Sequence, residues 1–228
     1  LLLPSSMLAA PGARGYVSRA GAKAAQVDVI SIQRPQAQPS SDPWLHSPAA
    51  SEQQRVLVIG AGGLGAPALL YLAASGVGTI GVIDDDVVET SNLQRQVIHT
   101  DARIGLPKVQ SASEAMRALN PFIEVRPYQR RLDAALAADL FADYDLILDG
   151  SDNFDTRYLV NELATKAGKP LISAAITQWE GQISVYHPAH GTPCYQCIFP
   201  HRPAPGMVPT CAEAGVASPL PGVIGSMM

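Results

Sequence analysis

From Arg55 onward, short apolar runs of strand length alternate with longer amphipathic stretches. Val56, Leu57, Val58 and Ile59 form a continuous apolar run, which is typical of a strand buried on both faces of a sheet. Alternation of strands with helical patterns indicates parallel strands that are joined by crossover helices. We therefore predict an α/β fold with a doubly wound, mostly parallel sheet and flanking helices.

The pattern predicts six strands and four helices. We expect the strands over residues 55–59, 79–84, 123–128, 146–149, 171–174 and 182–186, and the helices over residues 64–75, 108–119, 134–141 and 155–167. In the last helix the apolar positions follow three-and-four spacing, and Gly168 with Pro170 supplies a stop signal.

The first 50 residues have a different composition. They hold six prolines among Ser, Gln and Ala and show no sustained hydrophobic period. Such a segment buries too little apolar surface to offset the entropy that it would lose on ordering. We predict a disordered or low-complexity segment over residues 1–50 and a folded domain over residues 51–228.

Charge and cysteine content exclude several classes of function. The 228 residues carry 16 Lys and Arg against 20 Asp and Glu, so no broad basic surface is available for nucleic acid. No apolar run reaches the ~18 residues that a membrane-spanning helix needs. Two of the three cysteines form a C-x-x-C pair, which favours metal or thiol chemistry in a reducing compartment over a disulfide framework. We expect a cytoplasmic protein with neither a nucleic-acid nor a membrane partner.

A glycine motif follows the first predicted strand. Gly60, Gly62 and Gly65 form G-x-G-x-x-G at the opening of a helix. Glycine allows a tight turn and close backbone approach, and free N–H groups at a helix start attract phosphate. Asp84, at the end of the second strand, can accept hydrogen bonds from ribose hydroxyls. The glycine motif and Asp84 together predict a Rossmann-like nucleotide site. The acidic residues at positions 85, 86 and 89 are interpreted as a solvated loop.

Six further motifs follow the glycine loop. They are DDDVVETSNLQRQ at 84–96, GLPKV at 105–109, DGSDNFDTR at 149–157, EGQISVY at 180–186, PCYQCIFP at 193–200 and TCAEAGV at 210–216. In this order they resemble the MoeB/ThiF family of ubiquitin-activating-type adenylyltransferases. The resemblance implies an enzyme that uses ATP and Mg²⁺ to couple the C-terminal glycine of a ubiquitin-like sulfur-carrier protein, ending in Gly-Gly, to AMP. It places the reaction in molybdopterin cofactor synthesis, tRNA thiolation or thiamine synthesis, and it implies a homodimer.

The resemblance also implies roles for single residues. Arg95 and Lys108 would stabilise the charge that develops on the phosphates, and Asp152 would be the aspartate on the magnesium side. The nucleotide pocket would be completed by Gly63, Ser91, Asn92, Leu93, Gln94 and Asn153. Each catalytic residue also has a plainer interpretation: a surface arginine, a lysine at a helix start and an aspartate that N-caps a helix.

The cysteines allow two further hypotheses. Cys194 and Cys197 can give two thiolates to a tetrahedral Zn²⁺. The family's second C-x-x-C is absent from this sequence, which we expect to be C-terminally incomplete, and His187, His190 and His201 are the available substitutes. Cys211 resembles a loop cysteine that attacks the acyl-adenylate or takes part in sulfur transfer in some members, with a buried apolar cysteine as the alternative.

Two other functions stay open. A truncated, inactive family member would be a non-catalytic module that binds the carrier without turnover. A dehydrogenase would bind NAD with the same glycine loop, but it would not need the charged set of Arg95, Lys108 and Asp152.

Overall fold

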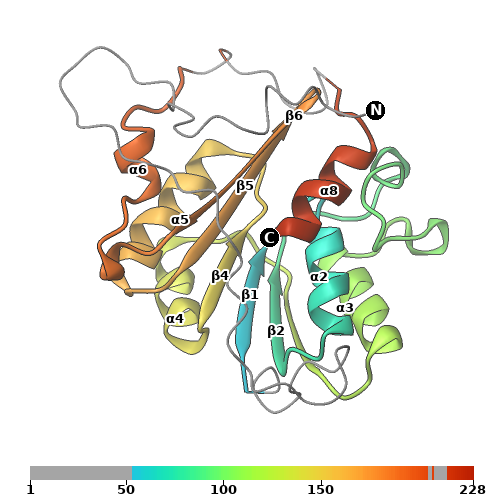
Figure 1. Cartoon of the computed structure of the whole chain (residues 1–228). Helices are drawn as coiled ribbons and strands as arrows, with labels where there is room; N and C mark the ends of the chain where they lie inside the picture. The colour runs from blue at the N-terminus through green and yellow to red at the C-terminus, as the bar shows by residue number, and fades with distance from the viewer. Residues whose placement is uncertain (1–52, 205–206, 208–214) are drawn as a thin grey trace, which may run out of the picture. The chain divides into compact units, whose positions relative to one another are not determined.

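The computed structural model describes residues 53–204, 207 and 215–228, and these form one six-stranded sheet with helices on both faces (Figure 1). The predictions for residues 1–50 and for Cys211 lie outside this part of the chain. The strand order is β3-β2-β1-β4-β5-β6, and all neighbours are parallel except β5 and β6. The strands are β1 (Arg55–Ile59), β2 (Thr79–Ile83), β3 (Glu124–Tyr128), β4 (Leu146–Asp149), β5 (Leu171–Thr177) and β6 (Glu180–Tyr186). The predicted fold class is confirmed.

The helices divide between the two faces of the sheet. They are α2 (Gly65–Ala74), α3 (Lys108–Leu119), α4 (Ala134–Asp143), α5 (Phe154–Lys166), α6 (Tyr195–Ile198) and α8 (Pro219–Met227), with 3-10 turns η2 (Thr90–Asn92), η3 (Asp101–Arg103) and η4 (Pro188–His190). Figure 1 shows α2, α3 and α8 on one face and α4, α5 and α6 on the other. No helix in the described ranges has the length and apolar content to cross a bilayer.

The apolar run of β1 supplies both layers of the core. Val56 and Val58 pack in the layer beneath α2 and α3, whereas Leu57 and Ile59 pack in the layer beneath α4 and α5. Successive side chains of a strand point to opposite faces, so a central strand needs apolar residues at every position. This constraint explains why the sequence pattern located β1 without error.

The remaining predictions were correct in type. The bounds of β4 and α3 also match the prediction, and the other bounds differ by one to three residues. The largest difference is in β5 and β6, which extend to a hairpin whose turn places Gln178 at a left-handed φ of 43°. The sequence did not predict α6, α8 or the three 3-10 turns. Helix α8 contains two prolines and two glycines, which disfavour a helix locally, so its formation depends on tertiary packing.

Helix α8 packs closely against two other parts of the domain. Ile224 and Leu220 lie against Gly181 of β6, where the glycine leaves room for them. At Gly225, a β-carbon would collide with the carbonyl oxygen of Leu64 and the ring of Pro67. The helix therefore joins β6 to the start of α2, and it can do so only because these positions lack side chains.

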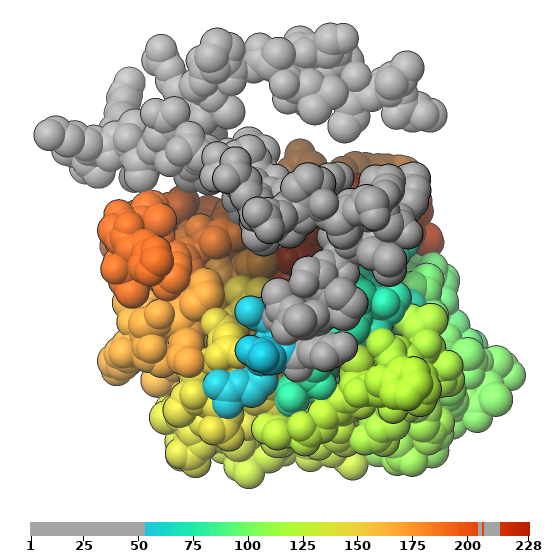
Figure 2. Space-filling model, turned by 60° about the horizontal axis from the view of Figure 1, so that its bottom comes forward, coloured from blue at the N-terminus to red at the C-terminus, as the bar shows by residue number. Residues whose placement is uncertain are grey.

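The two ends of the sheet differ in their surroundings. Figure 2 looks toward the end at which the parallel strands begin, where the first residues of β1 (cyan) lie between residues of α4 (yellow) and of α3 and β3 (lime green). The loops that follow the parallel strands lie at the opposite end of the sheet. The candidate site is built from those loops.

The packing of α8 predicts opposite effects for two glycines of the same helix. G225A should lower the free energy of unfolding by about 2 kcal/mol, because its β-carbon meets fixed backbone. G222A should raise it by up to about 1 kcal/mol, because no atom lies within 4 Å of the new β-carbon and alanine favours a helix. Urea unfolding of both variants measures the difference, and equal effects would contradict this packing.

Candidate functional site

The centre of the sheet brings two loops together. Strands β1 and β4 are parallel neighbours, with Ile59 opposite Asp149, and the Gly150 N–H donates to the Ile59 carbonyl at 2.9 Å. The chain leaves β1 toward β2 on one side, while β4 lies on the other. This is the switch point at which open α/β sheets bind ligands. The glycine loop after β1 and the turn after β4 therefore form the floor of one crevice.

The glycine loop requires glycine at its ends and leaves free donors in its middle. Gly60 has a φ of +92°, and a β-carbon there would lie 3.2 Å from the Gly150 carbonyl oxygen. A β-carbon at Gly65 would collide with the carbonyl oxygen of Gly60. Within the described ranges, the N–H groups of Gly62 and Gly63 donate to no acceptor. These two donors are available to an anion.

Asp84 holds the loop and keeps capacity for a ligand. Its Oδ2 accepts from the Ala61 N–H at 2.8 Å, and its Oδ1 accepts from the Asp86 N–H at 2.8 Å. Each oxygen retains a lone pair that a ribose hydroxyl could use. Burial raises the pKa of Asp84, and the positive charge of Lys108 opposes this shift. The ribose contact stays a prediction, and the anchoring of Ala61 is an additional role that the sequence did not indicate.

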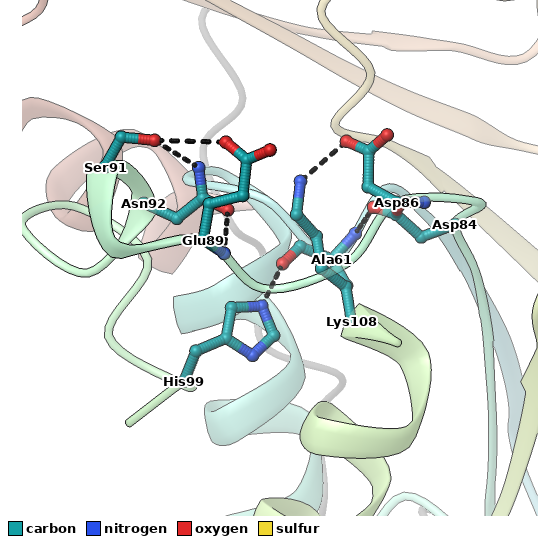
Figure 3. Close-up of polar contacts among 8 residues, drawn as sticks. All are labelled: Ala61, Asp84, Asp86, Glu89, Ser91, Asn92, His99 and Lys108. Carbon is teal, nitrogen blue, oxygen red and sulfur yellow. Dashed lines mark hydrogen bonds and ion pairs between the residues drawn. The ribbon is translucent and has the colours of Figure 1, made fainter. Parts of the chain in front are cut away.

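Lys108 is a nearly buried cation at the first position of α3. It is only 6% exposed, and its Nζ lies 2.7 Å from Oδ2 of Asp86 (Figure 3). The Asp86 side chain is largely exposed, so this pair is open to solvent from one side. The interpretation of Asp86 as a purely solvated acid was incomplete, because its carboxylate binds the lysine that the sequence assigned to the phosphates. An ammonium group has three donors, and the remaining ones can reach a ligand.

Arg95 lies beside the glycine loop at the end of a compact turn. Its Nη1 donates to the Ser91 carbonyl at 3.0 Å, and its Cγ is 3.9 Å from the place of a β-carbon on Gly63. Among the described residues, no carboxylate forms an ion pair with it. The guanidinium therefore keeps its charge for a ligand.

The segment before Arg95 is fixed by local hydrogen bonds. Glu89 and Asn92 form a capping box around η2, in which Asn92 Oδ1 accepts from the Glu89 N–H at 3.1 Å. The Ser91 hydroxyl donates to Glu89, and Gln94 accepts from the hydroxyl of Ser218, the N-cap residue of α8. Leu93 is partly buried, and its N–H donates to the Thr90 carbonyl. The predicted pocket residues 91–94 thus shape the turn that carries Arg95.

Asp152 and Asn153 lie in the turn after β4, and both were predicted to belong to the nucleotide site. Their side chains have different surroundings. Asn153, and not Asp152, is the N-cap of α5: its Oδ1 accepts from the Thr156 N–H at 2.8 Å. Asp152 is exposed and has no hydrogen bond or ion pair within the described part of the chain. Its carboxylate is therefore free for a cation, whereas the Asn153 side chain is already used.

Two buried charged residues support this turn, and their roles were not predicted from the sequence. The Asp149 carboxylate accepts from the Ser151 N–H at 3.0 Å and from the Ser151 hydroxyl at 2.6 Å. The Arg157 guanidinium donates to the carbonyls of Ser151 and Ala174 at 2.6 and 2.9 Å. Both residues belong to the motif at 149–157, which was the available signal.

His99 and Gln96 were also missed. His99 is buried, with Nε2 2.9 Å from the Ala61 carbonyl oxygen and Nδ1 2.8 Å from Ser111 Oγ. Burial lowers the pKa of His99; the hydrogen bond to Ala61 opposes the shift, and the charges of Lys108 and Arg103 add to it. Gln96 is buried next to Gly62, and its Oε1 has no partner in the described structure.

The cysteine pair offers two thiols, and no further ligand joins them within residues 53–204, 207 and 215–228. Cys194 and Cys197 have their sulfurs 3.4 Å apart. Burial raises the pKa of Cys194, but hydrogen bonds from Cys197 outweigh it and place that pKa below its usual range. No described histidine or carboxylate joins the pair in a group of three, and His187 and His190 stack on each other at 4.0 Å. The described residues therefore do not supply the four ligands of a structural zinc site.

The chain matches a protein-family model and is similar to many curated proteins, including the following two. Residues 49–228 match the model of the ThiF family. The sulfur carrier protein adenylyltransferase of Thermus thermophilus is 52% identical over 177 residues, which cover 76% of this chain and 65% of the relative. The probable adenylyltransferase/sulfurtransferase MoeZ of Mycobacterium tuberculosis is 56% identical over 177 residues, which cover 76% of this chain and 45% of MoeZ. The chain therefore spans less than two thirds of the length of these relatives.

A solved structure shares the fold. The crystal structure of the E. coli tRNA N6-threonylcarbamoyladenosine dehydratase TcdA in complex with ATP superposes with a TM-score of 0.54 and 25% identity. The match covers 55% of this chain and 52% of that chain.

The environment of His99 predicts a pH-dependent stability. Because the native state lowers the pKa of His99 below 6.5, the unfolded chain binds more protons as the pH falls through this value. The contribution of His99 is complete above pH 6.5 and is lost below it, by up to about 1.4 kcal/mol per pH unit. Urea unfolding between about pH 7.5 and pH 5.5 should show a steeper loss for the wild type than for H99Q. Asp84 remains in both proteins, so parallel curves would contradict the shift.

Proposed function

Because this chain belongs to the ThiF family, we propose that its domain is an ATP-dependent adenylyltransferase for a ubiquitin-like sulfur-carrier protein. One observation carries the proposal: Arg95 and Lys108, from separate segments, flank a glycine loop with free N–H groups at the switch point of the sheet. The names of the two relatives and the ATP complex of the structural neighbour support the choice of reaction and nucleotide. The reaction serves molybdopterin synthesis or the thiolation of tRNA.

The donors of the site suit the transfer of AMP to a carboxylate. The triphosphate lies over the glycine loop, with the N–H groups of Gly62 and Gly63 directed at its oxygens. The glycine carboxylate of the carrier attacks the α-phosphorus, and the bond from this phosphorus to the bridging oxygen of pyrophosphate breaks. The carboxylate is already ionised at neutral pH, so no general base is needed.

Catalysis then depends on positioning and charge. Negative charge accumulates on the departing pyrophosphate, and it is stabilised by Arg95 and by the nearly buried Lys108. Asp86 neutralises the buried Lys108, since its Oδ2 lies 2.7 Å from the lysine Nζ. This pairing avoids the cost of an isolated buried charge and keeps the ammonium group at the site.

Magnesium fits the site through Asp152. This carboxylate is exposed, has no partner in the described chain and stands at the carboxyl end of the central strands. When bound, the metal neutralises phosphate oxygens during transfer. Zinc has no part in this proposal, because the described residues bring only Cys194 and Cys197 together.

We further propose that the enzyme is a cytoplasmic homodimer that pairs through the groove between α2 and α8. Tyr71, Val97 and Val223 line this groove and are 65%, 62% and 57% exposed. A cluster of exposed apolar side chains of this kind indicates a protein interface. The groove borders the turn that carries Arg95, so the partner copy would lie next to the site.

Loss of either cation should abolish turnover without unfolding the domain. R95A and K108A should each reduce ATP–pyrophosphate exchange at least about hundredfold, because each removes a charge that stabilises the departing pyrophosphate. K166A is the matched control, since Lys166 pairs with Glu162 on the exposed face of α5. Near-normal exchange in R95A or K108A would contradict their assigned roles.

A mixing experiment with the 228-residue chain distinguishes the proposed enzyme from a non-catalytic binding module. ATP, Mg²⁺ and a carrier that ends in Gly-Gly should give a carrier whose mass is increased by one adenylyl group, which is AMP less one water. A carrier that binds the chain and shows neither this adduct nor pyrophosphate exchange would instead indicate a non-catalytic module.

The groove prediction is tested by the oligomeric state. V223E should shift the protein from dimer to monomer in light scattering, because a charge at the centre of an apolar interface is costly to bury. F122E is the control, since Phe122 is 95% exposed and does not line the groove. A dimer that persists in V223E, or a monomeric wild type, would overturn this interface.

A further inference from the structure

In the glycine loop, the N–H and the carbonyl oxygen of Ala61 each form a hydrogen bond to a side chain. Its N–H donates to Asp84 Oδ2 at 2.8 Å, and its carbonyl oxygen lies 2.9 Å from His99 Nε2 (Figure 3). Ala61 is completely buried. The two partners come from different segments, one after β2 and the other in the loop before α3. Ala61 therefore cannot turn without the loss of at least one buried hydrogen bond.

The hydrogen bonds of His99 also define its protonation state. A carbonyl oxygen only accepts, so Nε2 carries the proton and donates to Ala61. In the neutral ring, Nδ1 then accepts from the Ser111 hydroxyl at 2.8 Å. Ser111 lies on α3, one turn after Lys108. His99 thus links the glycine loop to the helix that carries the buried cation.

This contact fixes the direction of a free donor. The Ala61 carbonyl and the Gly62 N–H belong to one planar trans peptide, in which the two groups point in opposite directions. When His99 holds the carbonyl toward the interior, the Gly62 N–H must point away from it. That N–H has no acceptor in the described part of the chain.

We propose that His99 is a positioning residue for the nucleotide, which acts through the Ala61 peptide to aim the Gly62 N–H at the phosphates. His99 itself is only 5% exposed, so its effect passes through the loop and not through contact with the ligand. The inference rests on the proposed function, since it assumes that the loop binds ATP.

Three substitutions separate this role from simple packing. H99L removes the donor while it keeps an apolar side chain of similar length. H99Q retains an N–H that can reach the Ala61 carbonyl. S111A removes only the hydroxyl that orients the ring. M116A, a buried substitution elsewhere on α3, is the control for a general loss of stability.

The expected result is a change in nucleotide affinity. H99L should raise the KM and the Kd for ATP about tenfold, with kcat per folded molecule changed less than about twofold, because a misdirected N–H loses one phosphate hydrogen bond. H99Q should stay within about threefold of the wild type, and S111A should lie between them. M116A should leave the KM for ATP unchanged. Equilibrium binding of ATP and pyrophosphate exchange provide the two measurements.

Several outcomes would overturn the inference. One is an ATP affinity that is unchanged in both H99L and S111A. Another is an ATP affinity of H99Q that is as weak as that of H99L. If H99L does not fold, S111A and H99Q still decide the question. A wild-type protein that binds ATP but transfers no AMP would contradict the proposed function alone. Absence of ATP binding by the wild type would overturn both.

Discussion

The parallel pairing of β1 with β4 is the constraint on which the rest of the site depends. It sets Ile59 opposite Asp149 and thereby places the glycine loop against the turn that carries Asp152. The contact is so close that a β-carbon on Gly60 would lie only 3.2 Å from the Gly150 carbonyl oxygen, and the φ of +92° at Gly60 also favours glycine. A sheet with these strands apart would keep every motif and lose the crevice between them.

Burial at the site disfavours the charged forms of two titratable side chains. It raises the pKa of Asp84 and lowers that of His99, so it disfavours the charged form of both. Lys108 is also buried but is paired with a solvent-exposed carboxylate, and Arg95 has no carboxylate partner within the described ranges. Within the described ranges, the charged side chains at the loop without an ion pair include Arg95, which suits a phosphate, and Asp152, which suits a cation. That local arrangement, and not the net charge of −4, suits a polyphosphate with its metal ion.

The sequence predicted the parts of this structure that depend on local pattern. The apolar run of β1 and the glycine motif were located because both signals lie within a few adjacent residues. Helix α8 was not predicted, since its prolines and glycines disfavour a helix until Leu64 and Gly181 supply packing partners. His99 gave no signal because its partner Ala61 lies 38 residues earlier. Choosing between Asp152 and Asn153 as the cap likewise required the geometry of the turn.

The glycines that admit α8 show how function and stability are coupled here. A β-carbon on Gly63 would lie 3.1 Å from Pro221, and larger residues at Gly181 or Gly225 would displace the same helix. Glycine within a strand or helix costs stability, because the unfolded chain loses more conformational freedom there. The close approach of α8 offsets this cost by burying Ile224 and by binding Gln94 through Ser218. Because Gln94 directly precedes Arg95, the last described helix helps to hold Arg95 beside the glycine loop. The site is therefore assembled only when the whole domain is folded.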